Sequence, residues 1–134
     1  KAAPMRAVLA RAESLASQGV RLFAPLPRAG LIAALRHSRV MLYRGDANET
    51  FCMSVAEAQA LGVPAAVQAL GSMPERVQNG VTGFVDGDAQ SFAQHAIALL
   101  SDDALWREQH EAALRWQKGL GTDDVAQRFE ALLA

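Results

Sequence analysis

The sequence predicts an α/β fold, in which a short parallel sheet is flanked by helices. Along its 134 residues, short apolar runs alternate with segments of helical periodicity. The run "VMLY" (40–43) has no polar alternation, which is typical of a strand buried on both faces. The chain is long enough for one domain with a hydrophobic core, and its 51% hydrophobic and 20% charged residues are those of a globular protein.

The first half of the chain contains two predicted helices and two predicted strands. Residues 4–18 have helical periodicity up to Gly19, a natural C-terminal stop. The run "VRLFAP" (20–25) predicts a short strand that ends at Pro25. A second helix is expected over 28–38, with Leu31, Ile32 and Leu35 facing inward, followed by the strand 40–43. The apolar face of the first helix comprises Met5, Val8, Leu9, Ala12, Leu15 and Ala16.

The second half adds two strands and a series of helices. A helix is expected from about Ser54 to Leu61, where Gly62 and then Pro64 end it. Strands follow over 64–69 and 82–85, with a short helix in the loop between them, and the remainder is helical over about 88–100, 103–118 and 123–133. Two apolar stripes lie on these helices, one made of Phe92, Ala96, Leu99 and Leu100 and the other of Val125, Phe129, Leu132 and Leu133.

Charge and composition argue against several classes of protein. With 13 basic and 14 acidic residues the net charge is −1, so nothing draws the chain generally toward nucleic acid or an acidic membrane. No apolar run is long enough to form a transmembrane segment, and no signal peptide opens the chain. Cys52 is the single cysteine, which excludes an internal disulfide and a cysteine-based zinc site. We expect a cytoplasmic protein.

The stretch "ETFCMSVAEAQALGVP" (49–64) has two interpretations. In the structural one, Ser54 is the N-cap and Glu57 the third helical residue of a capping box, and Glu49 is a solvated loop residue. In the functional one, the helix start receives a phosphate or diphosphate, Glu57 accepts hydrogen bonds from a ribose diol, and Glu49 contacts sugar hydroxyls. Ligands of parallel α/β sheets bind at the carboxyl edge, where this stretch is expected.

This stretch resembles the E-x7-E motif of retaining, GT-B fold glycosyltransferases of the group 1, or family 4, type. A second block of that family, Gly-Gly-x-x-Glu followed by Asn/Asp-Gly-x-x-Gly, also has a counterpart here, although Ser72 replaces its second glycine. The resemblance extends over roughly residues 18–101. The positions that match the first block are Glu49, Phe51, Cys52, Glu57, Ala58, Ala60, Gly62 and Pro64, and those that match the second are Gly71, Glu75, Asn79, Gly80 and Gly83.

The resemblance implies a role for particular residues in binding a nucleoside diphosphate sugar donor. Glu57 would bind the ribose hydroxyls, and Glu49, the one residue assigned to catalysis, would contact the donor sugar. Residues near Pro25 and Leu26 would line the base pocket. The family works without a metal bridging the diphosphate, and no metal or cofactor is expected. Backbone amides around Phe51, Cys52 and Met53, together with the helix start at Ser54, would hold the sugar and the diphosphate.

The resemblance also implies a Rossmann-like domain from the C-terminal half of a GT-B enzyme. Residues 1–134 would form one nucleotide-sugar-binding domain that lacks its first strand, helix and strand, and the acceptor-binding N-terminal domain would be missing as well. The parent would transfer a hexose to an unknown acceptor with retention of configuration, and this part alone would be inactive. Any attachment to the inner membrane would be made through the missing domain. Alanine-rich helices near both ends suggest pairing with a second copy.

Two alternative functions remain open at this point. One is a nucleotide-sugar epimerase on the same fold. The other is a non-catalytic domain, either degenerate or a flavodoxin-like binding module, that keeps Glu57 only as a helix cap. His37 ends a predicted helix, where histidine suits the helix dipole, and His95 and His110 lie in helices without nearby partner carboxylates at ligand spacing. We therefore expect structural or surface roles for all three. The pairs Asp102-Asp103 and Asp123-Asp124 are expected to start helices, and Trp106 and Trp116 to pack against the domain or a missing partner.

Overall fold

A computed structural model describes residues 2–132 of the chain, with side chains from residue 5 onward. The chain divides into two compact units, Lys1–Ile32 and Ala33–Ala134. In the first unit, helix α1 spans Ala2–Ser14 and a 3-10 helix, η1, spans Ala16–Gln18. Gly19 ends this segment in the left-handed conformation, with φ of 95°, which confirms the predicted stop. Met5, Val8 and Leu9 on the predicted apolar face are exposed.

The predicted strand over 20–25 is wrong. These residues form no regular element and are exposed. A strand is stable only when a neighbouring strand takes up its backbone N–H and C=O groups. The single sheet found among the described residues pairs three other segments and offers 20–25 no partner. The predicted helix over 28–38 forms as α2, Arg28–Arg36, with Leu31 more exposed than expected.

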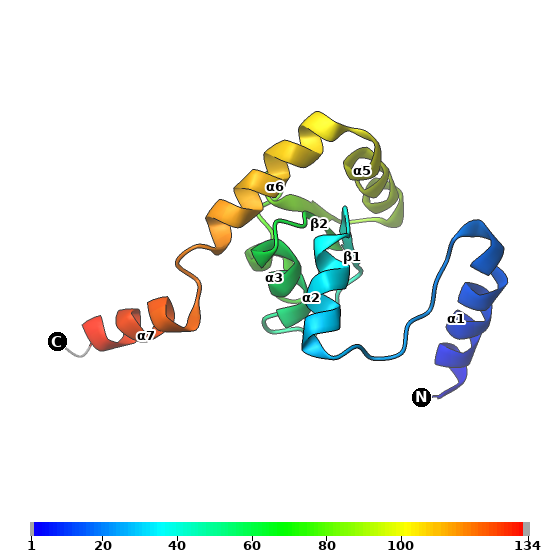
Figure 1. Cartoon of the computed structure of the whole chain (residues 1–134), viewed down its shortest axis with the longest axis horizontal. Helices are drawn as coiled ribbons and strands as arrows, with labels where there is room; N and C mark the ends of the chain where they lie inside the picture. The colour runs from blue at the N-terminus through cyan, green and yellow to red at the C-terminus, as the bar shows by residue number, and fades with distance from the viewer. Residues whose placement is uncertain (1, 133–134) are drawn as a thin grey trace. The chain divides into compact units, whose positions relative to one another are not determined.

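The second unit contains an open parallel sheet with the strand order β1-β2-β3 (Figure 1). The strands are β1 (Met41–Tyr43), β2 (Ala65–Gln68) and β3 (Gly83–Asp86). Helix α3 (Met53–Ala60) joins β1 to β2, and the short helix α4 (Met73–Arg76) lies between β2 and β3. This arrangement confirms the predicted α/β, Rossmann-like class. The remaining helices are α5 (Ala89–Ser101), α6 (Asp103–Gln117) and α7 (Thr122–Ala131).

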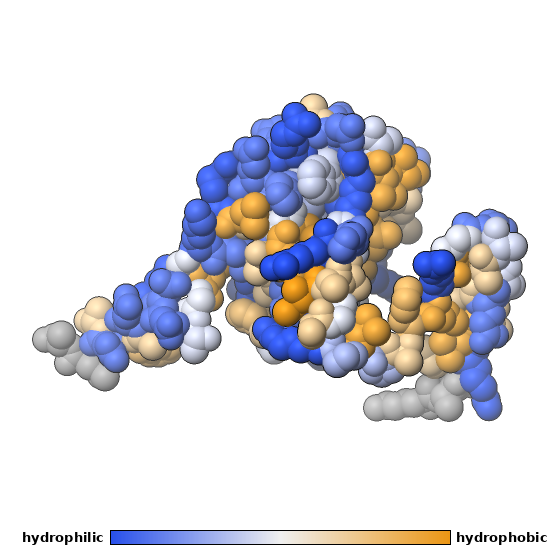
Figure 2. All heavy atoms as spheres, in the orientation of Figure 1, coloured by the Kyte–Doolittle hydropathy of each residue, from blue (hydrophilic) through white to orange (hydrophobic). Residues whose placement is uncertain are grey.

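A cluster of buried hydrophobic residues lies on one face of the sheet. Met41, Tyr43 and Val85 pack there against a buried cluster of Cys52, Val55, Ala65, Val67, Met73 and Val77. Helix α5 packs on β2 and β3, and α6 packs on α3 and α5. The expectation that "VMLY" is buried on both faces is wrong, because Leu42 is 50% exposed on the edge strand β1. Other apolar side chains also reach the surface, including Ile97, Leu100, Val125 and Phe129. Figure 2 shows hydrophobic residues, in orange, among the hydrophilic ones on one face of the molecule.

Several helix ends in this unit lie where the sequence predicts them. Asp88 caps α5 and Asp102 caps α6, each through a carboxylate oxygen that accepts two backbone N–H groups. Helix α3 ends before Gly62, which has φ of 77°, and Pro64 follows. Gly121 precedes α7, and Asp124 accepts a hydrogen bond from its backbone N–H at 3.2 Å. The predicted aspartate helix starts are thus confirmed in outline.

Candidate donor-binding site at the carboxyl edge of the sheet

The candidate site is built on the loop between β1 and α3. Parallel strands end at a common edge, and β1 ends there at Tyr43. The following loop contains Glu49 and leads to Cys52, the residue that precedes α3. The start of α3 therefore lies at the edge where α/β proteins bind ligands, as the sequence predicts.

The Glu49 carboxylate fixes the conformation of this loop. Oε1 accepts hydrogen bonds from the backbone N–H groups of Cys52 at 2.9 Å and Phe51 at 3.3 Å. Oε2 accepts a third from the Tyr43 hydroxyl at 3.1 Å. These three donors, of which the Cys52 amide has the largest effect, hold the pKa of Glu49 below its usual value. The hydrogen bond between Tyr43 and Glu49 raises the pKa of Tyr43. Two of the amides expected to hold a ligand are thus engaged by Glu49 here.

Cys52 is the one non-glycine residue with positive φ in the described part of the chain. Its φ of 60° and ψ of 78° place it in the left-handed region, which costs a non-glycine residue about 1–2 kcal/mol. The side chain is 2% exposed and belongs to the core cluster. Such backbone outliers persist where the surroundings force them, and they gather at ligand sites. The left-handed conformation of Cys52 lets the loop turn directly into α3, which begins at Met53.

The capping box expected from Ser54 and Glu57 does not form. Helix α3 begins at Met53 after Cys52 as N-cap, and no side chain supplies a cap hydrogen bond. Ser54 is therefore the second helical residue, and its Oγ lies 3.4 Å from Cys52 Sγ. Glu57 lies one turn beyond Met53, on the same side of the helix, and is half-buried. Glu57 is thus the fifth helical residue and not the third, which is the position that a capping box requires, so the expected box is wrong.

The two sequence blocks touch each other. The backbone N–H of Ser72 donates to the Glu49 carbonyl at 2.9 Å. Gly71 has φ of +53°, and a Cβ there would overlap the carbonyl oxygens of Asp46 and Glu49. Only glycine fits this close approach of two loops. Sequence reasoning missed the contact, although Gly71, in the loop that follows β2, was a signal for it.

The end of the second block, Asn79, Gly80 and Gly83, makes contacts that shape the start of β3. Asn79 Oδ1 accepts a hydrogen bond from the Val85 backbone at 3.0 Å. Gly80 adopts φ of 76° in the turn, and a Cβ on Gly83 would overlap the Ala65 backbone. Glu75, at the start of α4, is exposed.

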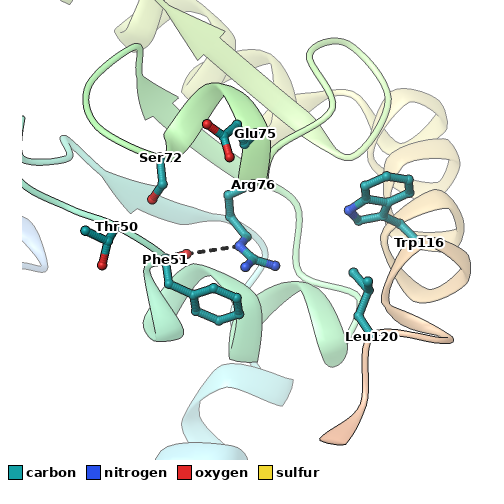
Figure 3. Close-up of a pocket in the computed structure, with 7 residues that line it drawn as sticks. All are labelled: Thr50, Phe51, Ser72, Glu75, Arg76, Trp116 and Leu120. Atoms are coloured by element: carbon teal, nitrogen blue, oxygen red, sulfur yellow. Dashed lines mark hydrogen bonds between the residues drawn. The ribbon is translucent and has the colours of Figure 1, made fainter. Parts of the chain in front are cut away.

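Arg76 is a site residue that the sequence analysis did not identify. Its Nε donates to the Phe51 carbonyl at 3.1 Å, and its guanidinium carbon lies 3.9 Å from the centre of the Phe51 ring (Figure 3). Burial lowers the pKa of Arg76, which stays a cation at neutral pH. Arg76 thus holds Phe51 by its backbone and by its ring. The contact joins α4 to the loop between β1 and α3 (residues 44–52), which we call the candidate donor loop.

The three histidines make structural contacts. His95 Nδ1 lies 2.7 Å from Asp86 Oδ1, so the expectation that it has no carboxylate nearby is wrong. The partner, Asp86, is the last residue of β3 and lies nine positions before His95, a separation that is not one of the spacings at which residues share a helix face. His110 Nδ1 lies 2.6 Å from the Gly62 carbonyl, and its ring stacks on Trp106. His37 Nδ1 lies 2.8 Å from the Ala33 carbonyl, within α2.

Two of the predicted donor-binding residues belong to the other unit. Pro25 and Leu26 lie in the exposed segment before α2, within Lys1–Ile32, so their place in the base pocket stays a prediction. Among the described residues, histidine, cysteine and acidic side chains nowhere form a group of three that could hold a metal. Within that same part of the chain, every helix is too short or too polar to cross a membrane.

The chain belongs to the glycosyl transferases group 1 family, whose family model matches residues 8–116. This match includes both sequence blocks and the whole β1–β3 sheet. The resemblance noted in the sequence is therefore confirmed at the level of the family.

Similar proteins are named glycosyltransferases or synthases. A D-inositol 3-phosphate glycosyltransferase of Corynebacterium urealyticum is 35% identical over 109 residues, which are 75% of this chain and 26% of that protein. An N-acetyl-alpha-D-glucosaminyl L-malate synthase of Bacillus anthracis is 40% identical over 81 residues, or 59% of this chain and 21% of that protein. A D-inositol 3-phosphate glycosyltransferase of Thermobifida fusca is 29% identical over 106 residues, which are 73% of this chain and 24% of that protein. The chain spans about a quarter of the length of these relatives.

Proposed function

We propose that this chain is the nucleotide-sugar-binding part of a retaining glycosyltransferase. The parent enzyme would transfer a hexose from a nucleoside diphosphate to an acceptor held by a further domain. The observation that carries the proposal is the turn at Cys52, which places Glu49 before α3 and Glu57 one turn inside it. Family membership makes sugar transfer the reaction to expect.

The start of α3 supplies the chemistry for the diphosphate. The first-turn amides of a helix have no intrahelical acceptor, and the helix dipole places partial positive charge there. A diphosphate at Met53 and Ser54 would accept hydrogen bonds from these amides. A ribose attached to it would reach Glu57 one turn along the helix, where a carboxylate accepts hydrogen bonds from a diol.

Glu49 would serve the donor sugar in two ways. Its hydrogen bonds to Phe51 and Cys52 hold the loop that would contact the sugar. Its lowered pKa keeps the carboxylate charged, so it would stabilise positive charge that develops on the sugar ring during transfer. Catalysis would then rest on placement and electrostatics, and no protein proton is required at this residue.

The names of the relatives favour transfer over epimerisation. Two names specify a D-inositol 3-phosphate glycosyltransferase and one an N-acetyl-alpha-D-glucosaminyl L-malate synthase. Inositol phosphate and malate are small hydroxylated anions, so we propose an acceptor of that class for the parent of this chain. We expect this chain to show no transfer by itself, because the acceptor would be held elsewhere.

The proposal is tested by thermal unfolding with UDP, GDP, ADP and their sugar conjugates. A ligand at about 100 times its dissociation constant adds roughly 2.7 kcal/mol to the free energy of unfolding. We expect a shift with one base, lost in Glu57→Gln and kept in Glu108→Gln, a matched change at an exposed glutamate of α6. No shift with any nucleotide at millimolar concentration, or an equal shift in Glu57→Gln, would contradict the proposal.

A further inference from the structure

A pocket of about 270 Å³ lies beside the candidate donor loop (Figure 3). Helix α4 and the preceding Ser72 form one side, the donor loop forms the floor, and the end of α6 with Leu120 forms the far side. Glu57, Met53 and Ser54 do not line it, so the pocket is separate from the proposed diphosphate position. Its walls are Thr50, Phe51, Ser72, Glu75, Arg76, Trp116 and Leu120.

Arg76 gives the pocket a fixed positive charge. Its Nε bond to the Phe51 carbonyl and its stacking on the Phe51 ring hold the guanidinium in one orientation. Its terminal amino groups point toward the space in front of Trp116 and Leu120 (Figure 3). Among the described residues Arg76 forms no ion pair. A guanidinium held in this way is pre-organised for a planar, two-point contact with a phosphate or carboxylate.

The other wall residues favour a ligand with a hydroxylated ring over a ligand that carries a second negative charge. Trp116 is 37% exposed and offers an aromatic face. Glu75 is a carboxylate that accepts hydrogen bonds from hydroxyl groups and opposes a multiply charged ligand. Ser72 brings a buried hydroxyl into the wall that finds no partner among the described residues. The volume is near the lower end of the range for small-molecule sites.

We propose that this pocket is a second ligand subsite, for a sugar or polyol that carries one phosphate or carboxylate group. The anion would bind Arg76, the ring would pack on Trp116, and hydroxyl groups would reach Glu75 and Thr50. The subsite goes beyond the proposed donor site and does not depend on it. Because Arg76 also holds Phe51, an occupied subsite would help to fix the donor loop.

The test is an NMR titration that follows the two tryptophan indole N–H signals. Trp116 lines the pocket, whereas the Trp106 indole is hydrogen-bonded to the Arg39 carbonyl and serves as an internal control. The probes are glucose 6-phosphate, glucose and inorganic phosphate. We expect glucose 6-phosphate to shift the Trp116 signal in a saturable manner at about millimolar concentration, a typical weak affinity. Glucose or phosphate alone should bind about tenfold more weakly or worse.

Variants separate the guanidinium charge from its contact with the donor loop. Arg76→Gln should weaken glucose 6-phosphate binding at least tenfold, whereas Arg76→Lys, which keeps the charge and loses the two-point contact, should bind with intermediate affinity. Arg107→Gln, at an exposed position of α6, and Glu57→Gln should bind like the wild type. The proposal is wrong if Trp116 does not respond, or if phosphate alone binds as well as glucose 6-phosphate. It is also wrong if Arg76→Gln binds normally, if Arg76→Lys fails like Arg76→Gln, or if Glu57→Gln abolishes binding.

Discussion

Single residues in the β1–α3 loop do more structural work than their sequence pattern indicates. Glu49 was expected to face a sugar, and its carboxylate also accepts three hydrogen bonds from its own surroundings. No periodicity or motif spacing encodes such a contact, because it depends on the backbone turning back at Cys52. The two sequence blocks predict residues of the candidate site, but not their hydrogen-bond partners and not Arg76.

Glu49 should make stability depend on pH in the acid range. A carboxylate whose folded pKa lies below its unfolded value adds stability above the unfolded pKa, here 4.5, and loses it as pH falls through the folded pKa. The pKa of Asp88 is lowered too, so Glu49→Gln should remove only part of this dependence. Thermal unfolding between pH 7 and 3 should show a flatter acid-side decline in Glu49→Gln. An unchanged decline, equal to that of the exposed control Glu108→Gln, would contradict this role.

Gly71 should tolerate substitution far less than Gly80. Both have positive φ, which costs alanine about 1–2 kcal/mol, but a Cβ at Gly80 meets nothing within 4 Å. A Cβ at Gly71 would also overlap two backbone carbonyls, so we expect Gly71→Ala to cost about 3 kcal/mol or more. Urea unfolding of the two variants measures the difference. Equal costs would mean that the loops do not pack as described.

Elements were easier to predict than their ends. The helices and strands after residue 38 appear where apolar periodicity and glycine stops place them, because local patterns determine them. The strand over 20–25 failed because β pairing is not local, and the sequence does not show whether a partner strand is present. The start of α3 was misplaced because a left-handed cysteine took the N-cap position in place of serine.

Helix caps give a direct test of that correction at the level of elements. Asp88→Ala should lower stability by about 1 kcal/mol, since its Oδ1 accepts backbone N–H groups at 2.8 and 2.9 Å. Ser54→Ala should change stability by less than about 0.5 kcal/mol, because Ser54 is not a cap. Denaturant unfolding of both variants separates the two cases. A loss of about 1 kcal/mol in Ser54→Ala would contradict this correction, because a loss of that size is expected when an N-cap residue is removed.

At the scale of the whole molecule, several large apolar side chains are exposed and are not covered by other described residues. Leu42 on the edge strand, Ile97 on α5 and Phe129 on α7 are each at least half exposed. Soluble domains rarely leave many large apolar side chains uncovered without a binding role. We propose that further segments of the parent protein cover part of this surface. Pairing with a second copy through the alanine-rich helices is the alternative, and light scattering of the chain distinguishes it.

The central claim, that the first turn of α3 receives a donor diphosphate, is tested most directly by mapping backbone amides. With the nucleoside diphosphate chosen from the unfolding panel, NMR titration should move the amide signals of Met53, Ser54 and Glu57 most. Signals of α5, which packs on β2 and β3, should move little. Saturable shifts confined to the residues around Glu57 and the α3 start would support the account. Shifts that bypass Met53 and Ser54, or no saturable shift at all, would contradict it.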